Sequence, residues 1–249
     1  MRTFLDIQYN SYAALDVYAP EGEGYPVFVY IHGGCLVSGD KADTFIKENA
    51  ESFVKAGYIF VSVNYRLYGK GAKYPDYLTD VAQAIAYVKK NAAAWGGNQD
   101  IYVSGSSAGA WIAAILCLSG EYLQAEGVNA QEIKGWIIDS AQMTSHFNAL
   151  KKEKGLDERT ERIDELAPLY YVDGNMCFSK MLLLFYENDW PCRLEQNMLF
   201  YRSVLNFQPD AQISYKVLKG KHCAGVTQKD EDGEYPYAKE TLLWLTKAI

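Results

Sequence analysis

The chain has 249 residues, of which 49% are hydrophobic and 22% are charged, and this composition is typical of a globular protein. Its length suits one α/β domain of ordinary size with a large buried core. The net charge of -7 argues against a nucleic acid or an anionic membrane surface as a partner.

Two strands joined by a turn are predicted at the start of the chain. Residues 6–20 alternate in hydrophobicity, and a segment with glycine and proline at 21–26 leads into the apolar run Val27–Ile31. A continuous apolar run of this kind is typical of a strand buried on both faces of a parallel sheet. It ends at His32-Gly33-Gly34-Cys35, where open α/β sheets carry their ligand chemistry.

Helices and buried strands then alternate along the chain. We expect helices at 43–56, 78–95 and 238–249, and strands at 58–64, 101–103, 133–138, 180–186 and 212–218. This alternation predicts a doubly wound, mostly parallel sheet with helices on both faces, in a single domain spanning 1–249. The interval 140–179 interrupts the alternation and contains a run of mixed charge, so we expect a small helical insertion there, with a solvated face or the role of a lid.

The segment Gly105-Ser106-Ser107-Ala108-Gly109 lies between a predicted strand and a small, apolar helix. The pattern G-x-S-x-G at such a corner is that of a nucleophile elbow, because only glycine-like flanks leave room for so sharp a bend. The N-terminus of the following helix presents free N–H groups to developing negative charge. Ser107 is therefore the candidate nucleophile.

A serine nucleophile needs a base within hydrogen-bond reach. The chain has three histidines: His32 in the glycine motif, His146 in the insertion, and His222 in a short loop after the last predicted sheet strand. The position of His222, downstream of the serine and at the end of a strand, makes it the candidate base.

The base in turn needs an acid that holds its tautomer, and we expect this acid at the end of the preceding strand. Asp189, in Tyr186-Glu187-Asn188-Asp189-Trp190-Pro191, fits this position, and Asp139 at the end of the strand before it is the reserve candidate.

Together these residues resemble the α/β-hydrolase family, and within it the esterase branch of hormone-sensitive-lipase-like, feruloyl and acetyl esterase-like and kynurenine formamidase-like proteins. The resemblance rests on the order Ser107, Asp189, His222 and on the motifs DVYAP (16–20), HGG (32–34), SGDK (38–41), NYRL (64–67), YP (74–75) with Asp80, and GSSAG (105–109).

The resemblance implies an α/β-hydrolase fold without a large N-terminal cap. It implies an oxyanion hole formed by the N–H groups of Gly33, Gly34 and Cys35 with that of Ala108, and a structural role for His32 in shaping this loop. The sequence departs from the family pattern at Cys35, where a third glycine or a bulky aromatic is usual. It also departs around the acid, where the flanking family motif is offset.

These features predict a cofactor-free and metal-free serine hydrolase that cleaves short-chain or small aromatic carboxylic esters through an acyl-enzyme. The alternatives are an amide or formamide hydrolase with the same three residues, and a non-catalytic ligand-binding member of the fold. The expected partner is a small-molecule ester, and the sequence does not indicate the oligomeric state.

Five cysteines at irregular spacings, with no C-x-x-C pair, indicate neither a disulfide framework nor a zinc site. An acid at Asp6 comes too early for a signal-peptide core, and the apolar run Met181–Phe185 is far too short to span a bilayer. We therefore expect free thiols, no membrane partner and a cytoplasmic location.

Overall fold

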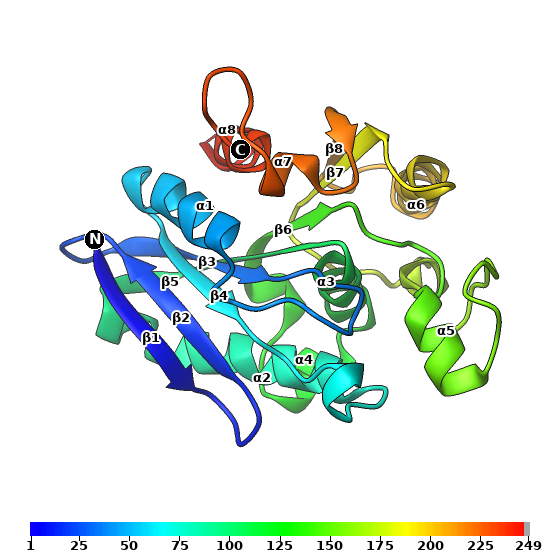
Figure 1. Ribbon diagram of the computed structural model, residues 1–249, viewed down its shortest axis with the longest axis horizontal. Helices are drawn as coiled ribbons and strands as arrows, with labels where there is room; N and C mark the ends of the chain where they lie inside the picture. The colour runs from blue at the N-terminus through cyan, green and yellow to red at the C-terminus, as the bar shows by residue number, and fades with distance from the viewer. Residues whose placement is uncertain (247–249) are drawn as a thin grey trace.

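One eight-stranded sheet, in the order β1-β2-β4-β3-β5-β6-β7-β8, organises the computed structural model, which describes residues 1–246 (Figure 1). The strands are β1 (Arg2–Gln8), β2 (Ala14–Ala19), β3 (Tyr25–Ile31), β4 (Ile59–Val63), β5 (Gly97–Ser106), β6 (Ile133–Asp139), β7 (Met181–Asn188) and β8 (Ile213–Lys221). The pairs β1–β2 and β2–β4 are antiparallel, and all the others are parallel. The predicted mostly parallel sheet is confirmed.

Helices cover both faces of this sheet (Figure 1). They are α1 (Thr44–Lys55), α2 (Asp76–Asn91), α3 (Ala108–Ser119), α4 (Glu121–Ala125), α5 (Phe147–Lys154), α6 (Arg193–Phe207), α7 (Ala224–Thr227) and α8 (Pro236–Thr246). One apolar cluster lies under α1, α7 and α8, and a larger one lies under α2, α3 and α6. Because the central strands are covered on both sides, β4 is buried over its whole length, as the apolar run predicts.

The start of the chain differs from the prediction of one continuous strand over 6–20. The structure has two strands there, β1 and β2, with a turn at 9–13. The Asn10 side chain makes this turn, since its Oδ1 accepts from the N–H groups of Tyr12 and Ala13, both at 2.8 Å. Asp6 adopts a left-handed φ of 55° at a shift of register between β1 and β2. The alternating pattern does not reveal this turn, because the turn is produced by local side-chain hydrogen bonds.

Helix α6 was not predicted, because its buried face includes polar side chains. Gln196 and Asn197 are both buried, and the Asn197 Nδ2 donates to the carbonyls of Ala141 and Arg193 at 2.9 and 2.8 Å. A pattern search based on apolar spacing does not detect a helix of this kind.

Two other helices differ from the prediction at their ends. The helix expected at 78–95 is α2, which ends at Asn91 and continues as a 3-10 turn over Ala92–Trp95. The helix expected at 238–249 is α8, described as far as Thr246, and residues 247–249 of that prediction lie outside the described residues.

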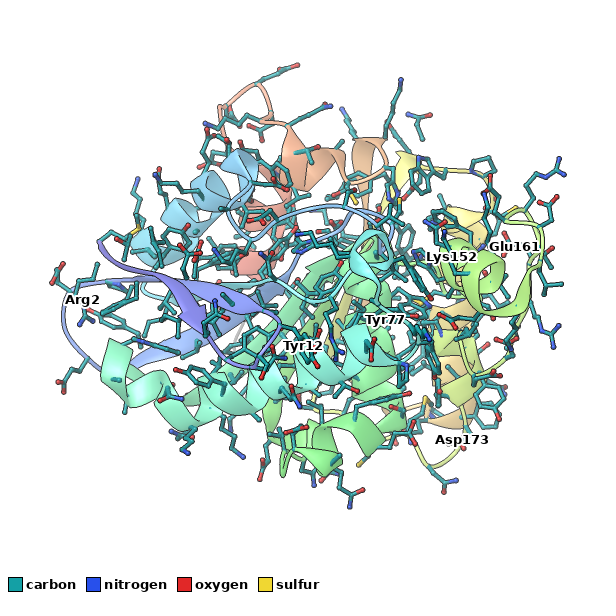
Figure 2. The ribbon with its side chains drawn as sticks, turned by 60° about the horizontal axis from the view of Figure 1, so that its bottom comes forward. Arg2, Tyr12, Tyr77, Lys152, Glu161 and Asp173 are labelled. Atoms are coloured by element: carbon teal, nitrogen blue, oxygen red, sulfur yellow. The ribbon has the colours of Figure 1, made fainter. Side chains whose placement is uncertain are left out.

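The interval 140–179 contains α5 and a 3-10 turn at Pro168–Tyr171. Only the first part of its charged run is helical, because Gly155, with φ of 64°, ends α5. Lys152 of α5 and Glu161 of the following loop lie at the opposite edge of the molecule from Arg2 of β1 (Figure 2).

Candidate active site

Ser107 occupies the corner between β5 and α3, with φ of 54° and ψ of -117°. A backbone in this region costs about 1–3 kcal/mol in a non-glycine residue and persists only where the surroundings enforce it. The surroundings here are tight: a Cβ at Gly105 would lie 2.3 Å from the carbonyl carbon of Gly109, and a Cβ at Gly109 would lie 2.1 Å from the carbonyl oxygen of Ile31. Both flanking positions of the motif therefore require glycine.

The structure brings Ser107, His222 and Asp189 together at the carboxyl ends of β5, β8 and β7. The Ser107 Oγ lies 2.8 Å from the Nε2 of His222, and the His222 Nδ1 lies 2.5 Å from the Oδ1 of Asp189. The tautomer that satisfies both contacts carries its proton on Nδ1, so that Nδ1–H donates to Asp189 and Nε2 accepts from Ser107. This is the geometry that a serine and its general base require.

The Asp189 side chain is only 1% exposed and is fully engaged. Besides the contact with His222, it accepts from the Ser140 Oγ and the Trp190 N–H, each at 2.7 Å. Burial would raise the pKa of Asp189, but the hydrogen bonds from His222, Ser140 and Trp190 outweigh it and lower the pKa below its ordinary value. The carboxylate is therefore held in its ionised form beside the imidazole.

Asp139, the reserve acid candidate, does not reach His222. Its carboxyl group instead accepts from the Ser106 Oγ at 2.6 Å and the Tyr186 hydroxyl at 2.9 Å, while its main-chain oxygen accepts from the Ser107 N–H at 2.8 Å. Of the two acids considered from the sequence, the structure places Asp189 against the histidine.

Two side chains at the site have no recognisable signal in the sequence. The Trp190 ring stacks on the His222 ring with centroids 4.0 Å apart and an interplanar angle of 16°. Ser140, which bonds Asp189, has a left-handed φ of 56° directly after β6. Both contacts depend on the pairing of neighbouring strands, which a local pattern does not reveal.

The glycine loop after β3 faces the serine. A Cβ added at Gly33 would lie 3.2 Å from the Ser107 Cβ, so this loop passes directly over the nucleophile. Gly34 has φ of 108°, and a Cβ there would lie 2.0 Å from the Ser38 carbonyl oxygen. The next residue, Cys35, also has a positive φ, of 58°, and its carbonyl accepts from the Asn148 Nδ2 at 2.8 Å. The insertion is thereby fastened to the glycine loop.

The N–H groups of Gly33, Gly34, Cys35 and Ala108 donate none of the hydrogen bonds formed within residues 1–246. Ala108 begins α3, whose first N–H groups have no partner inside the helix. Free backbone donors beside a serine can stabilise an anion that forms there.

The two other histidines lie away from the serine. His32 is stacked on Tyr65 at 4.4 Å, its Nδ1 bonds the Gly33 carbonyl at 2.7 Å, and burial lowers its pKa. Burial lowers the pKa of His146 to about 3, and its Nδ1 accepts from the Asn148 N–H as the N-terminal cap of α5. Both side chains therefore act structurally, as uncharged rings.

A cavity of about 560 Å³ opens beside Ser107 and His222. Its other lining residues are Tyr30, Gly33, Gly34, Cys35, Ser38, Gly39, Asp40, Asp43, Phe45, Ser106, Trp190, Cys223, Val226 and Thr227. Phe45, Trp190 and Val226 give the wall apolar area, Asp40 and Asp43 contribute carboxylates, and no lysine or arginine is among these residues. A small, uncharged or cationic molecule matches this lining better than an anion.

A second cavity, of about 670 Å³, lies beyond Gly39 and Asp40, which line both. Two of its three cations are already paired: the Lys41 Nζ lies 2.8 Å from Asp16, and Arg66 bonds Asp80, while the third is Lys70. It has no nucleophile next to a base, so the cavity at Ser107 is the candidate active site.

Within residues 1–246 no cluster of three or more histidine, cysteine, aspartate or glutamate side chains suits a metal ion. Over the same range, none of the helices combines the length and the apolar character needed to cross a bilayer. All five cysteines are free thiols, as expected.

The strand order, with a strained serine between β5 and α3, defines the α/β-hydrolase fold. The chain belongs to the BD-FAE family, whose model matches residues 15–203.

Similar curated proteins are esterases. "Esterase LipQ" of Mycobacterium tuberculosis is 35% identical over 100 residues, which are 39% of this chain and 23% of that protein. "Isoprenylcysteine alpha-carbonyl methylesterase ICME" of Arabidopsis thaliana is 33% identical over 136 residues, 53% of this chain and 30% of that protein. The matched segments thus span less than a third of these relatives.

Solved structures of esterases share the fold over nearly the whole chain. Esterase B from Lactobacillus rhamnosis superposes with a TM-score of 0.77 at 18% identity, covering 98% of this chain and 83% of that one. Thermogutta terrifontis Est2, solved with propionate bound, superposes with a TM-score of 0.72 at 21% identity, covering 95% and 89%. The predicted α/β-hydrolase fold is confirmed.

Proposed function

We propose that this protein is a carboxylic ester hydrolase that works through a serine-bound acyl intermediate. The observation that best supports the proposal is the continuous chain of contacts from the Ser107 Oγ through His222 to Asp189, at 2.8 and 2.5 Å. Membership of the BD-FAE family and the esterase names of the curated relatives favour the same activity.

The first half of the reaction forms the acyl-enzyme. The Ser107 Oγ attacks the ester carbonyl carbon while its proton passes to the His222 Nε2, and the Asp189 carboxylate stabilises the imidazolium that results. The negative oxygen of the tetrahedral intermediate accepts hydrogen bonds from the backbone N–H groups of the glycine loop and of Ala108. Removal of one such donor typically costs about 2.7–4 kcal/mol of transition-state stabilisation.

His222 then gives its proton to the departing alcohol oxygen as the C–O bond breaks, which completes the acyl-enzyme. In the second half, which releases the acid, His222 takes a proton from the water that attacks the acyl carbon. The second tetrahedral intermediate uses the same backbone donors. Collapse of this intermediate returns the proton to the Ser107 Oγ, so the enzyme ends in its starting state without a cofactor.

Short-chain or small aromatic esters are the proposed substrates. The cavity of about 560 Å³ is small, and Phe45, Trp190 and Val226 offer it apolar contact area. The related Thermogutta esterase was solved with propionate, a three-carbon acid, which agrees with a short acyl group here.

The experiment is hydrolysis of p-nitrophenyl acetate by the wild type and by Ser107→Ala, with Ser203→Ala on α6 as the matched control. We expect Ser107→Ala to lose at least a thousandfold in kcat with an unchanged melting temperature, and the control to match the wild type. If Ser107→Ala keeps activity within tenfold of the wild type, another nucleophile is responsible and the proposal fails.

A further inference from the structure

The contact between Ser107 and His222 joins two loops that are not neighbours in the sheet. Ser107 follows β5 and His222 follows β8, while β6 and β7 lie between these strands. Adjacent strands are about 4.8 Å apart, so β5 and β8 are separated by roughly 14 Å. The contact of 2.8 Å between the Ser107 Oγ and the His222 Nε2 therefore depends on the residues that connect the ends of β6 and β7.

A chain of hydrogen bonds crosses this gap. The Ser106 Oγ, next to the nucleophile, donates to the Asp139 Oδ2 at 2.6 Å, and the Tyr186 hydroxyl donates to the Asp139 Oδ1 at 2.9 Å. The same tyrosine hydroxyl accepts from the Gly225 N–H at 3.1 Å, three residues after His222. Asp139 and Tyr186 stand at the carboxyl ends of β6 and β7, so each intervening strand contributes one link.

This chain of contacts is sealed from solvent. Asp139 and Tyr186 are completely buried, and Ser106 is 2% exposed. A Cβ at Gly225 would lie 2.7 Å from the Tyr186 hydroxyl, so the histidine loop approaches the tyrosine as closely as a glycine allows. In a buried setting, each of these hydrogen bonds fixes its partners without competition from water.

We propose that Asp139 and Tyr186 are positioning residues that hold the His222 loop at hydrogen-bonding reach of Ser107. The inference rests on the proposed function, because positioning matters only if His222 acts as the base toward Ser107. Asp139 touches neither substrate nor reacting atoms, and it acts through Ser106 on one side and through Tyr186 on the other.

The charge of Asp139 adds a property that a neutral bridge would lack. Burial, with a smaller contribution from Asp189, raises the pKa of this carboxyl to about 7 against the hydrogen bonds from Ser106 and Tyr186. The titratable groups that face it from the elements around it are Tyr30, Tyr186, Asp189, Cys223 and Tyr237. None of these is a cation, so the ionised carboxylate relies on its two hydroxyl donors.

The ionised form accepts from both hydroxyls. The protonated carboxyl must donate one of its two hydrogen bonds, so the direction of the bond to Ser106 or to Tyr186 is reversed. We therefore expect kcat to gain an extra rise as the pH increases through about 7, and Asp139→Asn to lack this rise.

The first test compares two buried tyrosines whose hydroxyls bond different partners. Tyr186→Phe removes the link between Asp139 and Gly225. Tyr237→Phe is the matched control, since Tyr237 is also completely buried and its hydroxyl bonds the Ser104 Oγ at 2.7 Å, away from the His222 loop. With p-nitrophenyl acetate, Tyr186→Phe should lower kcat at least tenfold and change KM less than twofold, while Tyr237→Phe should change neither more than twofold.

The second test asks whether Asp139 and Tyr186 act as one unit. If they do, the double variant Asp139→Asn/Tyr186→Phe loses no more kcat than the worse single variant. The melting temperature of each variant shows whether it is folded. If a variant does not fold, Ser106→Ala takes its place, because it removes the hydrogen bond between Ser106 and Asp139 at the other end of the series.

Labelling by a fluorophosphonate probe separates the possible failures. A wild type that reacts with the probe, with Tyr186→Phe labelled as fast as Tyr237→Phe, overturns this inference alone. Multiplicative effects in the double variant, or an Asp139→Asn pH profile that superposes on that of the wild type, also overturn it. A wild type that neither reacts with the probe nor hydrolyses esters overturns the proposed function and this inference together.

Discussion

Replacing Asp189 by asparagine removes one charge from the site while leaving its shape. The Asp189 Oδ1 receives both the His222 Nδ1–H, at 2.5 Å, and the Trp190 N–H, at 2.7 Å, whereas Oδ2 receives only the Ser140 hydroxyl. Two donors therefore converge on one oxygen. In Asp189→Asn the amide oxygen takes this position, and the amide nitrogen faces Ser140, whose hydroxyl can turn and accept.

This geometry keeps the proton of His222 on Nδ1, so the variant should lose charge stabilisation and keep the productive tautomer. At an effective dielectric constant of about 20, unit charges about 4 Å apart attract by about 4 kcal/mol. The amide oxygen retains part of this through its hydrogen bond, so we expect a net loss of about 3 kcal/mol, or roughly a hundredfold in kcat. A flipped amide with the wrong tautomer would cost about ten-thousandfold, as in the serine protease triad.

The assay measures kcat for p-nitrophenyl acetate at saturating substrate, together with the melting temperature. Asp173→Asn, in an exposed loop that is not part of the cavity lining, is the control for a lost surface charge. A kcat of Asp189→Asn within threefold of the wild type would refute the assignment of Asp189 as the acid. A loss near ten-thousandfold would refute the argument that Trp190 and Ser140 orient the amide.

Other outcomes follow from the same contacts. Gly34→Ala should abolish activity and lower the melting temperature, because its Cβ would meet the Ser38 carbonyl at 2.0 Å; near-wild-type kinetics would contradict the described loop. The pKa of Asp139 is about 7 in the folded protein and about 4 in the unfolded chain, so between these pH values the folded state holds a proton that the unfolded state has lost. The free energy of unfolding therefore falls as the pH rises from about 4 to 7, by up to about 4 kcal/mol. Urea unfolding of the wild type and Asp139→Asn at pH 5 and pH 8 checks this, and an equal stability difference at both pH values would contradict it. Among p-nitrophenyl esters, kcat/KM should be highest for acetyl to butyryl and should fall by octanoyl, because Phe45, Trp190 and Val226 give the cavity only a short apolar wall on which added methylenes could each gain the usual 0.8 kcal/mol or so; a maximum at dodecanoyl would refute the short-chain proposal.

The parts of the fold that could be predicted are those that a local pattern specifies. The run Val27–Ile31 reads as a doubly buried strand and is one, since nothing but apolar side chains can occupy the centre of a covered sheet. The corner at Ser107 could be recognised from the fixed spacing of Gly105 and Gly109 around the serine, although the contact that requires Gly109 is with Ile31 of β3. His222 could be selected because the chain has only three histidines and this one follows the last predicted sheet strand, downstream of the serine.

The parts that could not be predicted depend on contacts across the sheet or on polar burial. Ser140 reaches Asp189 only because β6 and β7 are paired, and the stacking of Trp190 on His222 depends on the pairing of β7 with β8. Helix α6 could not be predicted from apolar spacing, because Gln196 and Asn197 on its buried face are polar. They are buried through hydrogen bonds to the residues that follow β6.

The central claim is that Ser107 is the nucleophile, and the most direct measurement is the site of covalent modification by a fluorophosphonate. After reaction at neutral pH, intact-mass spectrometry and peptide mapping give the number and position of adducts. We predict one adduct per chain, on the Ser107 hydroxyl, formed much more slowly in His222→Ala and absent from Ser107→Ala. An adduct on another residue, or stoichiometric labelling of Ser107→Ala, would contradict it.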